Sequence, residues 1–144
     1  MSDLTENLDE IQTGDDPEPT PTPEPTPPEP IQDSILNTIK QMLGLEADYT
    51  AYDTDVLIFI NSAFSVLTQL GVGGKHSFSI QDASAVWSDF IEGDTEFNMV
   101  KEYIYLSCKT IFDPPSSSFV LTAYKERMKE LEWRLNTASE FLPV

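Results

Sequence analysis

The chain has 144 residues, enough for one domain with a single hydrophobic core, and its formal net charge is −17. Such an acidic chain repels a nucleic-acid backbone, which excludes DNA or RNA binding through a basic patch. A single cysteine excludes an internal disulfide and any metal site built from several cysteines. The chain has no run of eighteen apolar residues and no signal peptide, so we expect a soluble protein that is not exported and contacts no membrane.

The first thirty residues differ from the rest in composition. Residues 1–32 carry nine acidic and no basic side chains, and eight of the sixteen residues 15–30 are proline. Proline at this density prevents a helix or a strand ladder and favours an extended polyproline II path. We therefore predict an acidic proline-rich arm at residues 1–30, disordered or bound to a partner, followed by a helical domain at residues 31–144.

Two helices are predicted first in the domain. The first begins at Asp33 or Ser34, whose side chains can cap it, and ends before Gly44. The second begins at Asp53–Asp55, where a capping side chain and negative charge suit a helix N-terminus, and it ends at Gly71. Because this second helix is apolar on almost every side, we expect it at the centre of the core.

A glycine-rich loop, residues 71–78, comes next. It is not a phosphate-binding loop, because no Gly-Lys-Ser/Thr follows a strand. Its residue His76 is the only histidine, and we interpret it as a solvated loop residue and not a catalytic base. A short amphipathic helix ending at Gly93 is predicted to follow, with its apolar face formed by Ile80, Ala83, Val86, Trp87, Phe90 and Ile91.

The next predicted helix begins at Asp94 or Thr95. Its buried face is expected to comprise Val100, Ile104, Cys108 and Ile111. Cys108 is accordingly interpreted as a small buried apolar side chain and not a nucleophile.

A break at Phe112–Pro115 separates this helix from the last one. The two prolines lack amide hydrogens and bias the residue before them away from helical angles. The hydroxyls of Ser116–Ser118 can cap a new helix, which we expect to run to about Asn136 and to be ~30 Å long. Its predicted apolar stripe is Val120, Tyr124, Met128, Leu131 and Leu135. The fold class is therefore all-α, a small bundle of about five helices with a long C-terminal helix.

No catalytic chemistry is evident. The sequence has no Ser/His/Asp arrangement, no metal-ligand cluster and no nucleotide loop, so we expect neither an enzyme nor a cofactor. Bases and acids alternate along the last helix, which indicates either a solvated mixed-charge face or a surface between subunits. Trp133 is out of phase with the apolar stripe, so it either anchors an interface or covers an edge of the core. The candidate interface residues are Phe112, Asp113, Pro114, Pro115, Trp133, Arg134, Phe141 and Leu142.

Several short segments, in this order and spacing, resemble the head–tail connector, or adaptor, proteins of long-tailed bacteriophages. They are Ile35-Leu-Asn-Thr-Ile-Lys40, Leu43-Gly-Leu45, Tyr49-Thr50, Asp53, Ile60-Asn-Ser-Ala63, Leu67-Thr-Gln-Leu-Gly-Val-Gly73, Ile80-Gln-Asp82, Trp87-Ser-Asp-Phe90, Val100-Lys-Glu-Tyr-Ile104, Phe112-Asp-Pro-Pro115 and Glu130-Leu-Glu-Trp-Arg-Leu-Asn136.

The resemblance implies a structural virion protein without enzymatic activity. Members of such a family form a ring beneath the portal, expected to share its twelve-fold symmetry. The ring extends the DNA channel, through which the genome passes without sequence-specific binding, and offers a platform to the next connector, stopper or tail-completion protein. The implied location is the virion neck, and the host cytoplasm during assembly. The arm at residues 1–30 has no counterpart in this resemblance.

Two other functions are compatible with parts of the sequence. An acidic DNA mimic would inhibit DNA-handling enzymes through carboxylates spaced like phosphates, but the densest acids lie in a proline-rich arm that holds no rigid spacing. A host adaptor domain with a proline-rich ligand arm is the other, although Pro21-Thr-Pro-Glu-Pro25 has no flanking base.

Overall fold

The computed structural model describes residues 33–74, 76–91 and 94–140. This part of the chain is helical and contains no strand, so the predicted all-α class is confirmed. Its helices are α2 (Ile35–Met42), α3 (Asp53–Gln69), α4 (Asp94–Phe112) and α5 (Ser118–Glu140), with a short 3₁₀ helix, η1 (Trp87–Asp89). Within these ranges no helix is long and apolar enough to cross a lipid bilayer.

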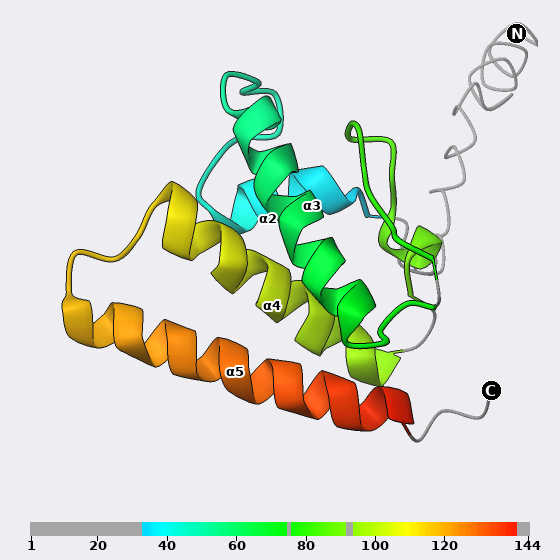
Figure 1. Cartoon of the computed structure of the whole chain (residues 1–144). Coiled ribbons are helices and arrows are strands. Elements are labelled where there is room, and N and C mark those ends of the chain that lie inside the picture. The colour runs from blue at the N-terminus through cyan, green and yellow to red at the C-terminus, as the bar shows by residue number, and fades with distance from the viewer. Residues whose placement is uncertain (1–32, 75, 92–93, 141–144) are drawn as a thin grey trace, which may run out of the picture.

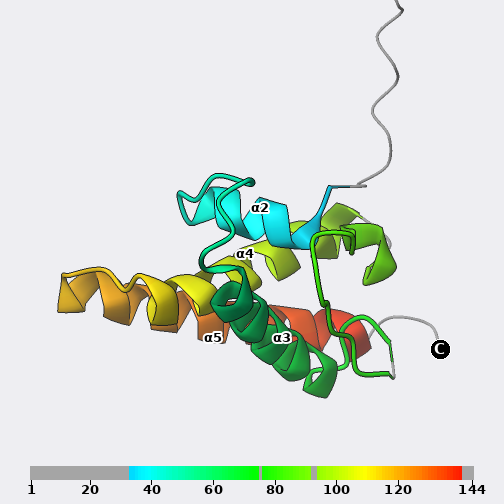
Figure 2. The same cartoon turned by 90° about the horizontal axis from the view of Figure 1, so that it is seen from above.

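Helix α4 occupies the centre of the bundle. It packs against α2, α3 and α5, and Figures 1 and 2 show it between α2 and α5. The sequence prediction put α3 at the centre, which is wrong. Although α3 is apolar on most sides, Ile58 points to solvent with 56% of its surface exposed.

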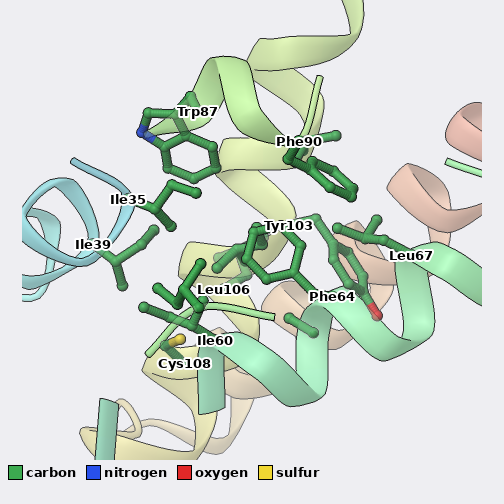
Figure 3. Close-up of a cluster of buried hydrophobic side chains, with 14 of the residues drawn as sticks. Ile35, Ile39, Ile60, Phe64, Leu67, Trp87, Phe90, Tyr103, Leu106 and Cys108 are labelled. Carbon is green, nitrogen blue, oxygen red and sulfur yellow. The ribbon is translucent and has the colours of Figure 1, made fainter. Parts of the chain in front are cut away.

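The core is formed where these helices face the segment 80–91. Figure 3 shows Ile35 and Ile39 of α2, Ile60 and Phe64 of α3, and Tyr103 and Leu106 of α4 converging below the indole of Trp87. Phe90 closes the other side, with its ring 4.7 Å from that of Phe64 and 5.1 Å from that of Phe78. Each fully buried side chain of this size contributes ~1.5–3 kcal/mol relative to its exposed state.

The first helix begins and ends as its sequence predicts. The hydroxyl of Ser34 accepts a hydrogen bond from the Asn37 amide at 3.2 Å, which satisfies one of the unpaired donors of the first turn. Gly44 follows the helix with φ +85°. The start of α3 differs from the prediction, because Tyr52 is its N-cap residue and its side chain makes no capping bond.

The segment 80–86 was expected to be helical, and this prediction is wrong. It is held to other parts of the chain by backbone groups. The side-chain Nδ2 of Asn61 donates to the backbone carbonyl of Ile80 at 2.9 Å, and the side-chain Oδ1 of Asn61 accepts from the backbone amide of Ile80 at 2.7 Å. The Ile35 amide donates to the Ala85 carbonyl at 3.0 Å, beside an isolated antiparallel bridge between Ser34 and Val86. Only the residues of η1 wind into a helical turn, and Ala83 is exposed.

The predicted buried face of α4 is correct at Val100, Ile104 and Cys108 and wrong at Ile111. Ile111 has 58% of its surface exposed, because the last turn of α4 extends beyond the side chains that cover its middle. Tyr103 and Leu106 are buried as well.

Helix α5 runs antiparallel to α4 and extends to Glu140, one turn beyond the predicted end at Asn136 (Figure 1). Leu131 and Leu135 of its apolar stripe are fully buried, whereas Val120, Tyr124 and Met128 are half-buried. The additional turn places the Ser139 hydroxyl 3.0 Å from the Leu70 carbonyl, to which it donates a hydrogen bond at the C-terminal end of α3. The extension is therefore tied to the rest of the fold.

Candidate assembly surfaces

The turn between α4 and α5 is built as its sequence indicates. Helix α4 ends at Phe112, and the Asp113 carboxylate accepts a hydrogen bond from the Lys109 ammonium at 2.6 Å. This contact raises the pKa of Lys109 above its ordinary value. After the two prolines, the Ser117 hydroxyl accepts from the Val120 amide at 3.4 Å and caps the first turn of α5.

Phe112 belongs to an exposed aromatic cluster beside this turn. Its ring lies 5.2 Å from that of Tyr52 in an edge-on arrangement, and Tyr52 lies 5.8 Å from Tyr49. Both tyrosines are more than two fifths exposed, and Phe112 is half-buried. We call these three residues the aromatic cluster. The sequence prediction named Phe112 alone, since nothing local to residues 45–52, interpreted as a connecting segment, indicates that Tyr52 packs on the end of α4 and Tyr49 on Tyr52.

Charged side chains join α4 to α5. The Arg127 guanidinium binds Glu102 of α4 through two hydrogen bonds of 2.7 and 3.0 Å, and it also lies 3.1 Å from the Glu130 carboxylate. These carboxylates raise the pKa of Arg127, and Arg127 lowers the pKa of Glu130. Glu132 accepts a hydrogen bond from the Tyr103 hydroxyl at 2.8 Å, and burial together with this bond raises the pKa of Tyr103.

Segment 130–136 is one of the segments that resemble the connector proteins. Most of its side chains make contacts within the fold. Arg134 pairs with Glu130 at 2.7 Å, Leu131 and Leu135 are buried in the core, and the side-chain Nδ2 of Asn136 donates to the Leu70 carbonyl at 3.4 Å. Trp133 differs from its neighbours because its ring is 68% exposed and forms no hydrogen bond or ring contact with any described residue. An exposed tryptophan in a segment whose other side chains mostly contact the rest of the fold is a candidate anchor for a partner.

The remaining predicted positions are distributed as follows. Pro114 is exposed and Pro115 half-buried in the turn. Arg134 is exposed, and its guanidinium pairs with Glu130 on the same helix. Phe141, Leu142 and the arm at residues 1–30 lie outside the described residues. The structure thus brings Phe112–Pro115 together at one end of α5 and places Trp133 and Arg134 in the other half of that helix.

Groups with catalytic potential are dispersed. Cys108 is fully buried, as predicted, and burial raises the pKa of its thiol to about 12, which keeps it protonated at neutral pH. His76 is exposed in the loop after α3. Among the described residues, no group of three histidine, cysteine or carboxylate side chains is arranged to hold a metal ion.

Comparison with known proteins gives one match. Residues 35–141 match the family model described as phage connector protein, and this range includes the four α-helices of the described residues and η1. No curated protein and no solved structure matches the chain. The chain therefore belongs to the family of phage connector proteins, structural components of the junction between the head and the tail of a phage virion.

Proposed function

We propose that this protein forms a ring that docks beneath the portal, extends the DNA channel and presents a platform for the next neck or tail protein. The observation that carries the proposal is the family match, which runs from the first residue of α2 past the end of α5. The ring is expected to share the twelve-fold symmetry of the portal. It assembles in the host cytoplasm and remains in the virion neck.

Exposed aromatic side chains support contacts between copies. A ring requires two different, mutually complementary surfaces on each subunit, because its contacts are heterologous. The aromatic cluster lies where α4 ends, whereas Trp133 lies in the C-terminal half of α5. Tyrosine and tryptophan are the residue types that contribute most to the energy of protein interfaces. We assign these two separate surfaces to subunit–subunit or subunit–portal contacts.

The charge distribution supports passage of DNA without binding. Acidic residues outnumber basic ones by seventeen, and Lys40, Lys109, Arg127 and Arg134 are paired with carboxylates within the fold. A channel of this charge repels phosphates, so the genome slides through it.

The proposal is tested by measuring molecular mass in solution for the chain alone, for a purified portal ring, and for their mixture. Native mass spectrometry or light scattering should show one ring of this chain added to each portal ring. A DNA mimic would instead remain a monomer or dimer, would not bind the portal ring, and would bind a DNA-handling enzyme. This result would overturn the proposal.

A variant pair sharpens the same experiment. Trp133→Ala should weaken addition to the portal while leaving the melting temperature of the free chain unchanged, because the ring is exposed. Ile58→Ala, which truncates an exposed side chain on α3 and leaves α5 unchanged, is the matched control. Equal loss of binding in both variants would argue against Trp133 as an anchor.

A further inference from the structure

The described part of the chain contains seven of the eight basic residues, and most are already engaged. Four pair with carboxylates, namely Lys40, Lys109, Arg127 and Arg134. A fifth, Lys101, places its ammonium 5.8 Å from the centre of the Phe97 ring. Lys125 and Lys129 are the two that form neither an ion pair nor a contact with an aromatic ring among the described residues, and both are exposed.

These two lysines share one side of α5 with Trp133. The three residues are spaced four apart, and side chains at this spacing are neighbours on a helix surface. The opposite side of the helix carries Leu131 and Leu135, which are buried against the bundle. We call this outward row the Lys125–Lys129–Trp133 ridge.

The ridge retains positive charge on a molecule that is otherwise acidic. Glu126 is exposed beside it, Glu130 pairs with Arg127 and Arg134, and the half-buried carboxylate of Glu132 is turned toward the Tyr103 hydroxyl of α4. A tryptophan ring at the end of a row with two ammonium groups that pair with no described carboxylate is suited to a ligand that is both acidic and rich in proline. Proline-rich segments dock on exposed aromatic rings, and carboxylates pair with lysine.

We propose that the Lys125–Lys129–Trp133 ridge binds residues 15–30 from the arm of a neighbouring copy of this chain. This segment has eight prolines, five acidic residues and no base among its sixteen positions. Its prolines would pack on Trp133, and its carboxylates would pair with Lys125 and Lys129. The arm would thereby act as a strap between copies.

The geometry favours a neighbouring copy over the arm's own chain. The described chain begins at Asp33, beside the first turn of α2, and α4 lies between α2 and α5 (Figures 1 and 2). A proline-rich segment is semi-rigid and advances ~3.1 Å per residue. To reach the outer side of its own α5, residues 15–30 would have to bend around both α4 and α5, whereas the ridge of another copy requires no such bend.

The contact should be weak between free molecules and stronger in an assembly. A single exposed ion pair contributes little, so we expect a dissociation constant in the millimolar range between free molecules. In a ring, each arm is held close to the next copy, which raises its effective concentration. The inference rests on the proposed function only in that the ring supplies the neighbouring copy. Binding between free molecules tests the strap without the portal.

The test uses the full-length protein. A nitroxide spin label is attached to a Glu24→Cys variant, in which the buried Cys108 is shielded from the reagent. The labelled, unenriched protein is then mixed at millimolar concentration with ¹⁵N-enriched unlabelled protein. The signals of the Trp133 indole and of the Lys125 and Lys129 amides on the enriched copy should broaden, and the broadening should diminish as salt is raised.

Matched charge variants provide the control. Lys125→Glu combined with Lys129→Glu should abolish the broadening, and Trp133→Ala should reduce it several-fold at the lysine amides. Lys101→Glu makes the same change of charge at one site on a different helix, α4, and should leave the broadening unaltered. The proposal is overturned by absence of broadening in the mixture, by broadening centred on another surface such as the aromatic cluster, or by broadening seen only when label and ¹⁵N are on one chain.

Discussion

At the scale of single residues, the most unusual feature is a buried ammonium group. Lys40 has 1% of its surface exposed, and its Nζ atom lies 2.7 Å from the Asp53 carboxylate and donates a hydrogen bond of 3.0 Å to the Ala47 carbonyl. Burial of a charge is costly unless it is both paired and hydrogen-bonded. These two contacts hold the connecting segment 45–52 against the start of α3, and so position Tyr49 and Tyr52 of the aromatic cluster.

Lys40→Ala should therefore lower the free energy of unfolding by about 2 kcal/mol. We expect a smaller loss than the ~3–5 kcal/mol that follows when a fully buried ion pair is broken, because Asp53 is 27% exposed and water can reach it. The measurement is urea denaturation, with Lys101→Ala as the control, since Lys101 has no carboxylate partner among the described residues. A loss below about 0.5 kcal/mol, as at an ordinary surface site, would contradict this role.

Two glycines allow the cost of backbone strain to be measured apart from the cost of a steric clash. Gly44 and Gly73 both have positive φ, +85° and +80°, a conformation that costs an alanine ~1 kcal/mol. A Cβ atom on Gly44 would meet nothing within 4 Å, but one on Gly73 would lie 2.3 Å from the Phe90 ring. That ring is fixed between Phe64 and Phe78 and has little room to move.

Gly73→Ala should consequently destabilise the fold by about 1–3 kcal/mol more than Gly44→Ala, which is the typical cost of overpacking. Thermal melting of the two variants beside the parent chain measures the difference. Equal melting temperatures would mean that the loop moves away from Phe90 without cost.

At the scale of elements, glycine and proline made most of the helices predictable. Gly44 and Gly71 mark the ends of α2 and α3, and the break at Phe112–Pro115 separates α4 from α5. Between these signals the apolar period of 3.6 residues indicated helices of nearly the observed length. The aromatic cluster and the extra turn of α5 depend on contacts between residues far apart in the chain. A local sequence pattern does not indicate such contacts.

Segment 80–91 shows most clearly why periodicity failed. Its apolar residues recur at helical spacing, yet Ile80 is bound by Asn61, nineteen residues earlier, and Ala85 by Ile35. Backbone hydrogen bonds to distant partners replace those that a helix would make within itself. Ile111 was misassigned for a related reason, since it continues the period of α4 past the point where neighbouring helices cover it.

The turn between α4 and α5 offers a test at this scale. Replacing Pro114 and Pro115 together by alanine should lower stability by ~1 kcal/mol, because the unfolded chain gains conformational freedom. The helices should also fray or extend at the junction, which changes the direction of α5. Thermal melting and infectious titre after complementation are the measurements. Normal values of both in the double variant would show that the prolines are dispensable.

At the scale of the whole molecule, the core and the proposed assembly surface use different residues of helix α5. Helix α5 uses Leu131 and Leu135 for the core, Arg127 for the contact with α4, and Ser139 for the end of α3. Its outward side, with Trp133, is not needed for any of these contacts. Changes on that side should therefore separate folding from assembly.

The last four residues, Phe141–Val144, allow the same separation by truncation. Because α5 is tied to Leu70 by Ser139, the chain should be cut after Glu140 and not within the helix. We expect this truncated protein to melt within a few degrees of the parent and to fail to join the portal, since the removed segment is apolar and follows the last helix. A cut after Thr137, which also removes the Ser139 contact, should lower the melting temperature as well. Heads that acquire tails normally with the protein cut after Glu140 would show that Phe141 and Leu142 have no part in assembly.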